Sequence, residues 1–482
     1  MLRLIRLLLF ILVFLGVLIG SAPFLIARYV DLDAYRPQIA ALASKALGAQ
    51  VVLDGPLSFT AMPTLGLVLN KPRVIKDDRE IIALEKIRLD LSIKPLFDRI
   101  LQFERINLVS PQVSLTSNSK LNLIAPKLGN GSGMSIPYGF KIRIAKTGDV
   151  SIRDANLSYS HPDWEQPLQI IGADFELYSP GFNFMDSSGG PKASISGKLF
   201  VDSLQTPYMS LNNIKSSVNR SGSVVRFDKL SADLFGGHGH GRLVIDRSKA
   251  TPQMEFQFAL KDFDIARLLE IVSEQVIMSG PADVSVDLRW EGMALQSMLA
   301  SLDGETLVSG EGITLHGVNV DKLLDQIKKV QRINLVDLGA FMFMGPWGTA
   351  MVKGRELSGA VKATSGATGI LDKFISRWSL KDGIAQAEDV AFATTKNRVA
   401  LRGRINLVTR HIDGITVAVL NKKGCATFSQ KIHGALDNPT IEKPSLLKAL
   451  TTPVSGALAA PLKLLTGKRC DVFYAGSLAH PG

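Results

Sequence analysis

Apolar and polar residues alternate along most of this 482-residue chain. Met254, Phe256 and Phe258 alternate with polar neighbours, and the pattern recurs at residues 87–93, 284–290, 405–407 and 417–419. Successive side chains of a strand point to opposite faces, so a period of two predicts strands with one apolar and one wet face. Asp-Gly pairs separate many of these runs. We therefore expect a mainly β protein, with many antiparallel strands and a few short helices.

The apolar face of such a sheet must be covered. A compact sandwich of about 450 residues would exceed the usual size of a single core. Two arrangements remain: several sandwiches in a row, or one long antiparallel sheet curled into an elongated hydrophobic groove. In the curled form, lipid chains can cover the apolar faces. The predicted groove residues are Leu89, Leu91, Met254, Phe256, Phe258, Val284, Val286 and Leu288.

The N-terminus carries a membrane-anchor signal. Arg3 and Arg6 precede an uncharged apolar run over residues 7–27, close to the ~20 residues that a spanning helix needs. Positive residues before the first helix favour a cytoplasmic N-terminus. A cleaved signal peptide is the alternative, but Pro23 directly follows the small residues at 20–22 and the apolar run continues beyond it. Both interpretations export the rest of the chain. The next longest apolar stretch, residues 335–347, is too short to span.

Three segments predict helices. Asp33 is a candidate N-cap for a helix ending at Gly48, and a short helix is expected at residues 264–269. Another is expected at 319–324, extending over 318–330. The last two, each following a strand, could form a weak internal repeat or a chance similarity. Residues 117–138 are polar and predict a loop. The expected divisions are an anchor at 1–30, the helix and first strands at 31–116, a loop at 117–140, and a continuing β-groove with a C-terminal cap segment at 141–482.

The two cysteines, Cys425 and Cys470, could form a disulfide or remain two unrelated buried thiols. An extracytoplasmic location permits the disulfide, which would close a loop of ~45 residues and contribute about 3–4 kcal/mol. The net charge of +11 could attract an anionic membrane surface. We favour a generally basic solvated surface, because no basic cluster with interleaved aromatics is present. Nucleic acid is not an expected partner in that compartment.

The sequence offers no persuasive catalytic constellation, so an enzyme, a cofactor and a metal site are not expected. His238 and His240 would share one strand face, but no carboxylate or cysteine at fixed spacing completes a metal site. We interpret their glycine-rich surroundings as a tight turn leading into a strand at 243–245. Asp77 and Asp78 predict a solvated turn. P-loop, Rossmann, nucleophile-elbow and zinc-protease motifs are absent from the sequence. Trp290, Trp347 and Trp378 are interpreted as packing residues.

Four ordered groups of segments resemble the AsmA family of bacterial envelope proteins. They are YRPQI at 35–39 with 46–48 and LDGPLS at 53–58; INL at 106–108 with PQVSL at 111–115; SLDG at 301–304 with GITLHGV at 312–318; and AEDV at 387–390 with 401–403, 424–426 and QKIHG at 430–434. Each motif is unspecific alone, whereas the ordered set covers essentially the whole chain. The loop after Leu121 departs from the family, because it lacks the Ala-Asn-Trp found in many members.

The resemblance implies a signal-anchored, single-pass inner-membrane protein whose bulk lies in the periplasm of a Gram-negative cell. It implies a curled antiparallel sheet with a lipid-accommodating groove, similar to bridge-like lipid-transfer proteins. Its expected partners are phospholipid acyl chains, the inner membrane and outer-membrane assembly factors. Roughly 30 strands spaced ~4.8 Å apart would reach at most about 140–150 Å. A single chain is therefore not expected to bridge two membranes, and a partner or a shuttle role would be needed.

These features lead to one main functional hypothesis and one alternative. The main hypothesis is a non-enzymatic protein that supports outer-membrane biogenesis by carrying phospholipid along the groove. The alternative is a scaffold that modulates the assembly or localisation of outer-membrane proteins without binding lipid. An enzyme acting on envelope glycan or lipid is a third possibility, for which the sequence offers no polar cluster.

Overall fold

A computed structural model describes residues 33–60, 64–98, 100–117, 134–136, 140–142, 149–162, 164–178, 194–207, 209–271, 278–317, 319–322, 324–325, 368–436, 438–442, 445–446 and 471–481. The protein is mainly β, with few helices. The chain divides into two units, Met1–Ala232 and Asp233–Gly482, and each is described by itself.

The first unit opens with the predicted helix. A short 3₁₀ turn, η1 (Asp33–Tyr35), leads into α2 (Arg36–Leu47), which has a proline in its first turn. Gly48 ends the helix in the left-handed conformation with φ 64°, and its N–H donates to the Ser44 carbonyl at 2.9 Å. The helix and its glycine stop are confirmed. Asp33 does not cap α2; its carboxylate accepts the Leu57 N–H at 2.9 Å and so ties the segment to the sheet.

The strands after α2 form two antiparallel branches. One pairs in the order β2–β3–β6–β8 and the other in the order β1–β4–β5–β9. The bounds are β1 (Gln50–Leu53), β2 (Leu57–Thr60), β3 (Gly66–Asn70), β4 (Pro72–Lys76), β5 (Arg79–Ala83), β6 (Lys86–Leu91), β8 (Phe103–Val109) and β9 (Gln112–Thr116). Ile39, Ala40 and Ala43 of α2 pack on a core built from both branches. This part of the first unit therefore has a covered core.

The alternation at residues 87–93 ends earlier than predicted. Ile93 is not the last strand residue: it begins the short helix α3 (Ile93–Phe97) and is 54% exposed. The physical reason is Pro95, which lacks the N–H that a strand ladder needs.

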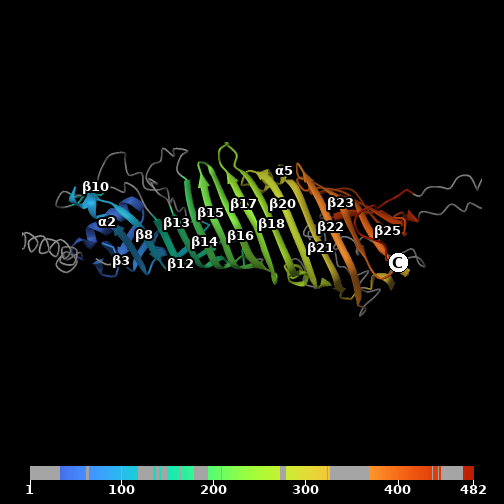
Figure 1. Ribbon diagram of the computed structural model, residues 1–482, viewed down its shortest axis with the longest axis horizontal. Helices are drawn as coiled ribbons and strands as arrows, with labels where there is room; N and C mark the ends of the chain where they lie inside the picture. Colours follow the sequence, from blue (N-terminus) through green and yellow to red (C-terminus); the bar gives the residue numbers. More distant parts are fainter. Residues whose placement is uncertain are drawn as a thin grey trace, which may run out of the picture. The chain divides into compact units, whose positions relative to one another are not determined.

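The sheet of the first unit is mixed. Both β8 and β9 pair in parallel with successive halves of β12 (Asp149–Ser160). A purely antiparallel sheet was therefore a wrong expectation here; the long connection between Thr116 and Asp149 makes a parallel return possible. Antiparallel strands follow in chain order, side by side in Figure 1: β13 (Leu168–Tyr178), β14 (Ser194–Gln205) and β15 (Ser210–Ser221).

A separate small sheet joins β7 (Ile100–Leu101), β10 (Met134–Ile136) and β11 (Phe140–Ile142). Strand β10 lies inside the segment expected to be a loop, most of which falls outside the described residues. The boundary between the two units falls within β16 (Val224–Leu234).

The second unit is a succession of long antiparallel strands. Its order is β17–β18–β20–β21–β22–β23–β24–β25–β26, visible side by side in Figure 1 from β17 to β23. The bounds are β17 (Gly237–Asp246), β18 (Gln253–Asp264), β19 (Met278–Ser279), β20 (Pro281–Glu291), β21 (Asp303–Leu315), β22 (Gly369–Lys381), β23 (Ile384–Ala393), β24 (Arg398–Asn406), β25 (His411–Leu420), β26 (Ala426–Ala435), β27 (Asn438–Ile441) and β28 (Ser445–Leu446). Strand β19 pairs with β21, and β27 and β28 both pair with β26.

Short helices lie between these strands. The predicted helix is confirmed as α4 (Ile265–Leu269), and the Asp264 carboxylate caps it by accepting the Ala266 N–H at 3.0 Å. Asn319 makes the equivalent bond to the Lys322 N–H at 3.0 Å at the start of the next helical segment. The predicted extension over 326–330 lies outside the described residues. A further helix, α5 (Leu295–Ala300), follows β20.

Bulges interrupt several strands. Asp262 has φ 53°, and the β18–β20 register shifts between Leu260 and Phe263. The Asp283 carboxylate accepts the Asp262 N–H at 2.9 Å and the Lys261 ammonium at 2.6 Å, which stabilises a backbone conformation unfavourable for a non-glycine residue. These bonds and the cation lower the pKa of Asp283. Each bulge increases the local twist of the sheet.

No helix in the part of the chain that the structure describes is long and apolar enough to cross a membrane. The predicted anchor, residues 7–27, lies outside that part.

Candidate functional site

The predicted groove residues of the second unit share one face of the sheet. Phe256 pairs with Leu243 on β17 and with Leu288 on β20, and Phe258 pairs with Val286. Directly opposed residues of antiparallel strands lie on the same face. We call these residues the apolar lane, and the face that carries them the lane face: Leu243, Ile245, Met254, Phe256, Phe258, Leu260, Val284, Val286, Leu288 and Val308.

The lane is incompletely covered. Met254 and Leu260 are buried, at 5% and 2% exposure, whereas Phe256, Phe258 and Val286 are only half-buried. The opposite face of the same strands is polar: Glu255, Ser285 and Arg289 are exposed there, and the Gln257 amide donates to the Asp287 carboxylate at 2.7 Å. The predicted one-sided character of β18 and β20 is confirmed.

Two phenyl rings run along the lane. The Phe256 and Phe258 rings stack with centroids 5.8 Å apart and planes 10° from parallel. The Phe258 ring lies over Gly239 of β17, where an added Cβ would collide with it. The lane therefore has a broad aromatic surface, and Gly239 of β17 leaves room for the Phe258 ring.

This packing corrects our interpretation of the glycine-rich segment. Strand β17 already begins at Gly237, and only Phe235 and Gly236, with φ 53° and 85°, form the turn. His238 and His240 project from the opposite face, and His238 Nδ1 lies 2.6 Å from an Asp233 carboxylate oxygen. These glycines serve strand packing, because the Phe258 ring occupies the space of a side chain at Gly239 and main-chain atoms of β18 approach Gly237 and Gly241 closely.

The other two predicted groove residues belong to the first unit. Leu89 of β6 packs against the core under α2, and Leu91 at the end of that strand is 6% exposed. Leu89 is half-buried, and Leu91 is part of the buried interior.

Parts of β23, β24 and β25 are buried on both faces, whereas β22 and β26 alternate between buried and exposed residues. Val399, Ala400 and Leu401 are consecutive residues of β24 with exposures of 0%, 0% and 2%. The expectation of one wet face is therefore wrong for this part of the sheet. On the opposite face, Tyr474 and Leu478 pack on alanines of β23, β24 and β25. We call residues 471–481 the C-terminal strap.

Specific polar contacts hold the strap. The Gly424 carbonyl accepts the Phe473 and Tyr474 N–H groups at 2.9 and 3.0 Å. Asp389 accepts the Tyr474 hydroxyl, and it accepts the Ser477 N–H and hydroxyl at 3.1 and 2.7 Å. Burial first, and the bond to Asp389 second, raise the pKa of Tyr474 well above its usual value.

Arg398 also contributes to the strap site. Its guanidinium donates to the Leu478 carbonyl at 2.8 Å and lies 5.4 Å from the centre of the Tyr474 ring. Burial lowers the pKa of this arginine. The sequence analysis expected a C-terminal cap segment but did not place it on β23 to β25. The local signal was the continuous apolar runs at 399–401 of β24 and 417–420 of β25.

The predicted disulfide is partly visible. Cys425 is disulfide-bonded, and a short antiparallel bridge pairs it with Val472, two residues past Cys470. Cys470 itself lies outside the described residues. Its pairing with Cys425 stays a prediction that the geometry of the strap favours.

Other singled-out residues have structural roles. Asp77 and Asp78 form an exposed turn between β4 and β5 with φ 52° and 56°, so the solvated turn is confirmed. Trp378 is buried at 2% exposure and Trp290 packs beside the same core, as expected; Trp347 lies outside the described residues. Among described residues, no group of three or more His, Cys, Asp or Glu side chains could hold a metal ion.

The structure thus defines a mainly β protein with many paired strands and a partly open apolar face. The model of the AsmA family matches residues 1–131 and 190–345, more than half of the chain. The chain therefore belongs to the AsmA family. The matched ranges include β17 to β21 and hence the lane, whereas β22 to β26 and the strap lie beyond them. No curated protein matches the chain.

Proposed function

We propose that this AsmA family protein carries phospholipid acyl chains on the apolar lane and so supports outer-membrane biogenesis. The observation that most supports this proposal is the incomplete burial of Phe256, Phe258 and Val286. Their counterparts on later strands, such as Val390 and Val399, are 1% and 0% exposed. A contiguous half-buried apolar surface is an expected site for an apolar ligand.

The chemistry of the lane favours hydrocarbon over a polar ligand. Its side chains are aliphatic or aromatic, so they offer an acyl chain dispersion contacts and removal from water. Each buried methylene contributes about 0.8 kcal/mol, so partial coverage of one chain is enough for reversible binding. The proposed activity is binding and movement without bond chemistry.

Two further features support the proposal. Family membership suggests a role in lipid transport or outer-membrane assembly. The uncharged run at residues 7–27 would hold the chain in the inner membrane with its bulk in the periplasm. A chain held there would have access to inner-membrane phospholipid.

A charge placed in the lane tests the proposal. We expect the purified full-length protein to carry phospholipid that mass spectrometry detects. The Val286→Asp variant should carry at least tenfold less phospholipid than the wild type. A carboxylate on the lane must be desolvated when an acyl chain covers it. The matched control is Ser285→Asp, which adds the same charge to the exposed opposite face of the same strand.

Thermal melting of both variants separates lost binding from lost folding. If the wild type carries no lipid, or if Ser285→Asp loses as much as Val286→Asp, the proposal fails.

The scaffold alternative has one observation in its favour. Met293 and Leu295, at the start of α5, are 74% and 68% exposed, which suits a protein contact. An empty lane together with crosslinks from Leu295 to outer-membrane proteins would favour the scaffold over the carrier.

A further inference from the structure

Burial of the lane face changes abruptly from β21 to β22. Val286 of β20 and Val308 of β21 are half-buried. On β22, Phe374 and Trp378 fall to 6% and 2% exposure, and on β24 and β25 Ile405 and Ile415 reach 0%. The strands remain paired and antiparallel throughout, with bulges in the β22–β23, β23–β24 and β24–β25 pairings. The same sheet face is therefore partly open over β17–β21 and filled over β22–β26.

Two aromatic residues stand at this transition. Phe374 pairs with Gly310, and its ring leans over β21 so far that an added Cβ on Gly310 would collide with it. Trp378 pairs with Thr306, and its indole N–H donates to the buried Ser376 hydroxyl at 2.9 Å. Because the indole N–H is hydrogen-bonded within the protein, the Trp378 ring has a fixed position at the end of the lane.

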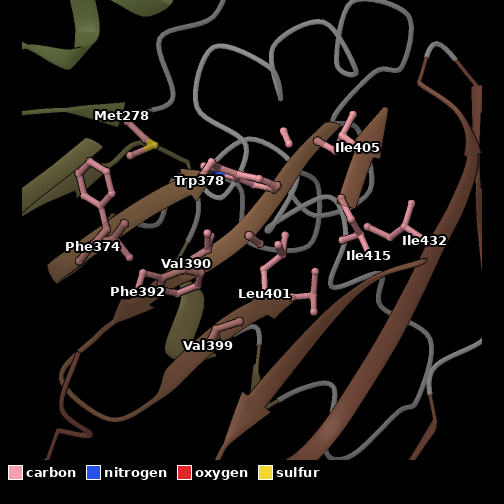
Figure 2. Packing of buried hydrophobic residues seen from close by; sticks show 14 of the residues in the cluster. Met278, Phe374, Trp378, Val390, Phe392, Val399, Leu401, Ile405, Ile415 and Ile432 are labelled. Carbon is pink, nitrogen blue, oxygen red and sulfur yellow. The ribbon is translucent and has the colours of Figure 1, made fainter. Parts of the chain in front are cut away.

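Both aromatics belong to a large cluster of buried side chains that draws on several elements. Ile265 and Leu269 of α4, together with Met278 and Val320, belong to the same core cluster as the lane-face residues of β22–β26. Figure 2 shows the side chains of this cluster packed together, with Met278, Phe374 and Trp378 grouped at one side. A close-packed core admits no acyl chain unless its residues part.

We infer that the apolar lane is blind-ended: an acyl chain bound over β17–β21 stops at a wall formed by Phe374 and Trp378. This inference rests on the proposed function and specifies its mode. Lipid cannot thread along the lane face past β22, so it leaves by the route on which it entered. Four strands spaced ~4.8 Å apart provide about 15 Å of lane. The second unit then holds lipid in a lane that is closed at one end. It does not pass lipid through from one end of the lane face to the other.

Photoreactive lipid maps the wall on the unmodified protein. The full-length wild type is loaded with phosphatidylethanolamine bearing a diazirine near the acyl terminus, irradiated, and digested for peptide mass spectrometry. We expect adducts on residues 254–260, 284–290 and 304–310 and on the wall itself, with at least tenfold fewer on residues 399–419. A probe with the diazirine beside the headgroup serves as the positional control.

The outcomes separate the two proposals. Adducts on residues 399–419 at yields comparable with the lane would overturn the blind end and leave the lipid carrier standing. Adducts confined to the opposite face, or none on the protein, would reject both.

A wall variant provides a second readout. Trp378→Leu shortens the wall and should allow adducts to reach Val390 on β23, whereas Trp164→Leu, in the first unit, should leave the map unchanged. Thermal melting verifies that both variants fold. A folded Trp378→Leu protein with an unchanged map counts against Trp378 as part of the wall.

Discussion

At the scale of single residues, the second unit depends on glycines placed under phenyl rings. Gly239 lies under Phe258 and Gly310 under Phe374. The two sites differ in the ring above them, because Phe258 is half-buried and Phe374 is 6% exposed. A half-buried ring can swing towards solvent when a methyl group is added below it, whereas a buried ring cannot.

That difference predicts unequal effects of the same substitution. Gly310→Ala should lower the free energy of unfolding by about 1–3 kcal/mol, as expected for overpacking a core. Gly239→Ala should cost less than ~1 kcal/mol, because the gain in backbone rigidity partly offsets displacement of the ring. Chemical denaturation of the two variants beside the wild type measures both. Equal costs would show that the burial of the ring does not control the effect.

At the scale of elements, the strap covers a sheet face that the sequence analysis expected to be wet. Its segment supplies Tyr474 and Leu478 to an alanine-rich face whose residues, including Ala400 and Ala418, are 0% exposed. Small side chains let the strap approach closely, and Asp389 fixes its position through Tyr474 and Ser477. The strap thereby turns one-sided strands into strands buried on both faces.

Removing the Asp389 carboxylate should therefore loosen the strap. Asp389→Ala deletes the acceptor for three hydrogen bonds and should destabilise the protein by about 2–3 kcal/mol. Hydrogen exchange of residues 471–481 should become faster in that variant. The control is Asp413→Ala on β25, which removes an exposed ion pair with Arg404 and should cost no more than ~1 kcal/mol. Similar costs and unchanged exchange in the strap would contradict this role of Asp389.

At the scale of the whole molecule, the proposed location of the protein depends on the N-terminal run at residues 7–27. A run of about 20 uncharged residues has the length of a spanning helix. We expect the mature chain to keep residues 1–22 and to stay with the inner membrane after high-salt and alkaline washing. Intact mass spectrometry and membrane fractionation measure both properties. A mature chain that begins at Pro23 and is released by the wash would indicate a cleaved signal peptide.

Local patterns predicted much of the fold. The alternation around Phe256 and Val286 located β18 and β20 and the face that they share. The helix ending at Gly48 and the short helix α4 were also predicted, because their signals lie within a few neighbouring residues. Ile93 was misassigned although its signal was local, since Pro95 lies two residues away.

The remaining errors arose from contacts distant along the chain. Gly237 and Gly239 were interpreted as a turn because the atoms that pack over them, from Phe263 and from the Phe258 ring, belong to β18. The opposite face of β24 was expected to be wet because the strap that covers it lies more than seventy residues later. Likewise, the core cluster that includes Phe374 and Trp378 also draws side chains from α4 and from the segment with Val320, which lie more than fifty residues earlier in the chain.

The sequence by itself therefore determined which segments are strands and which of their side chains share a face, because side-chain direction follows from the backbone period of two. Only the tertiary structure decided which apolar faces protein side chains cover and which stay half-open. Coverage depends on packing between segments far apart in sequence, and no local period encodes it.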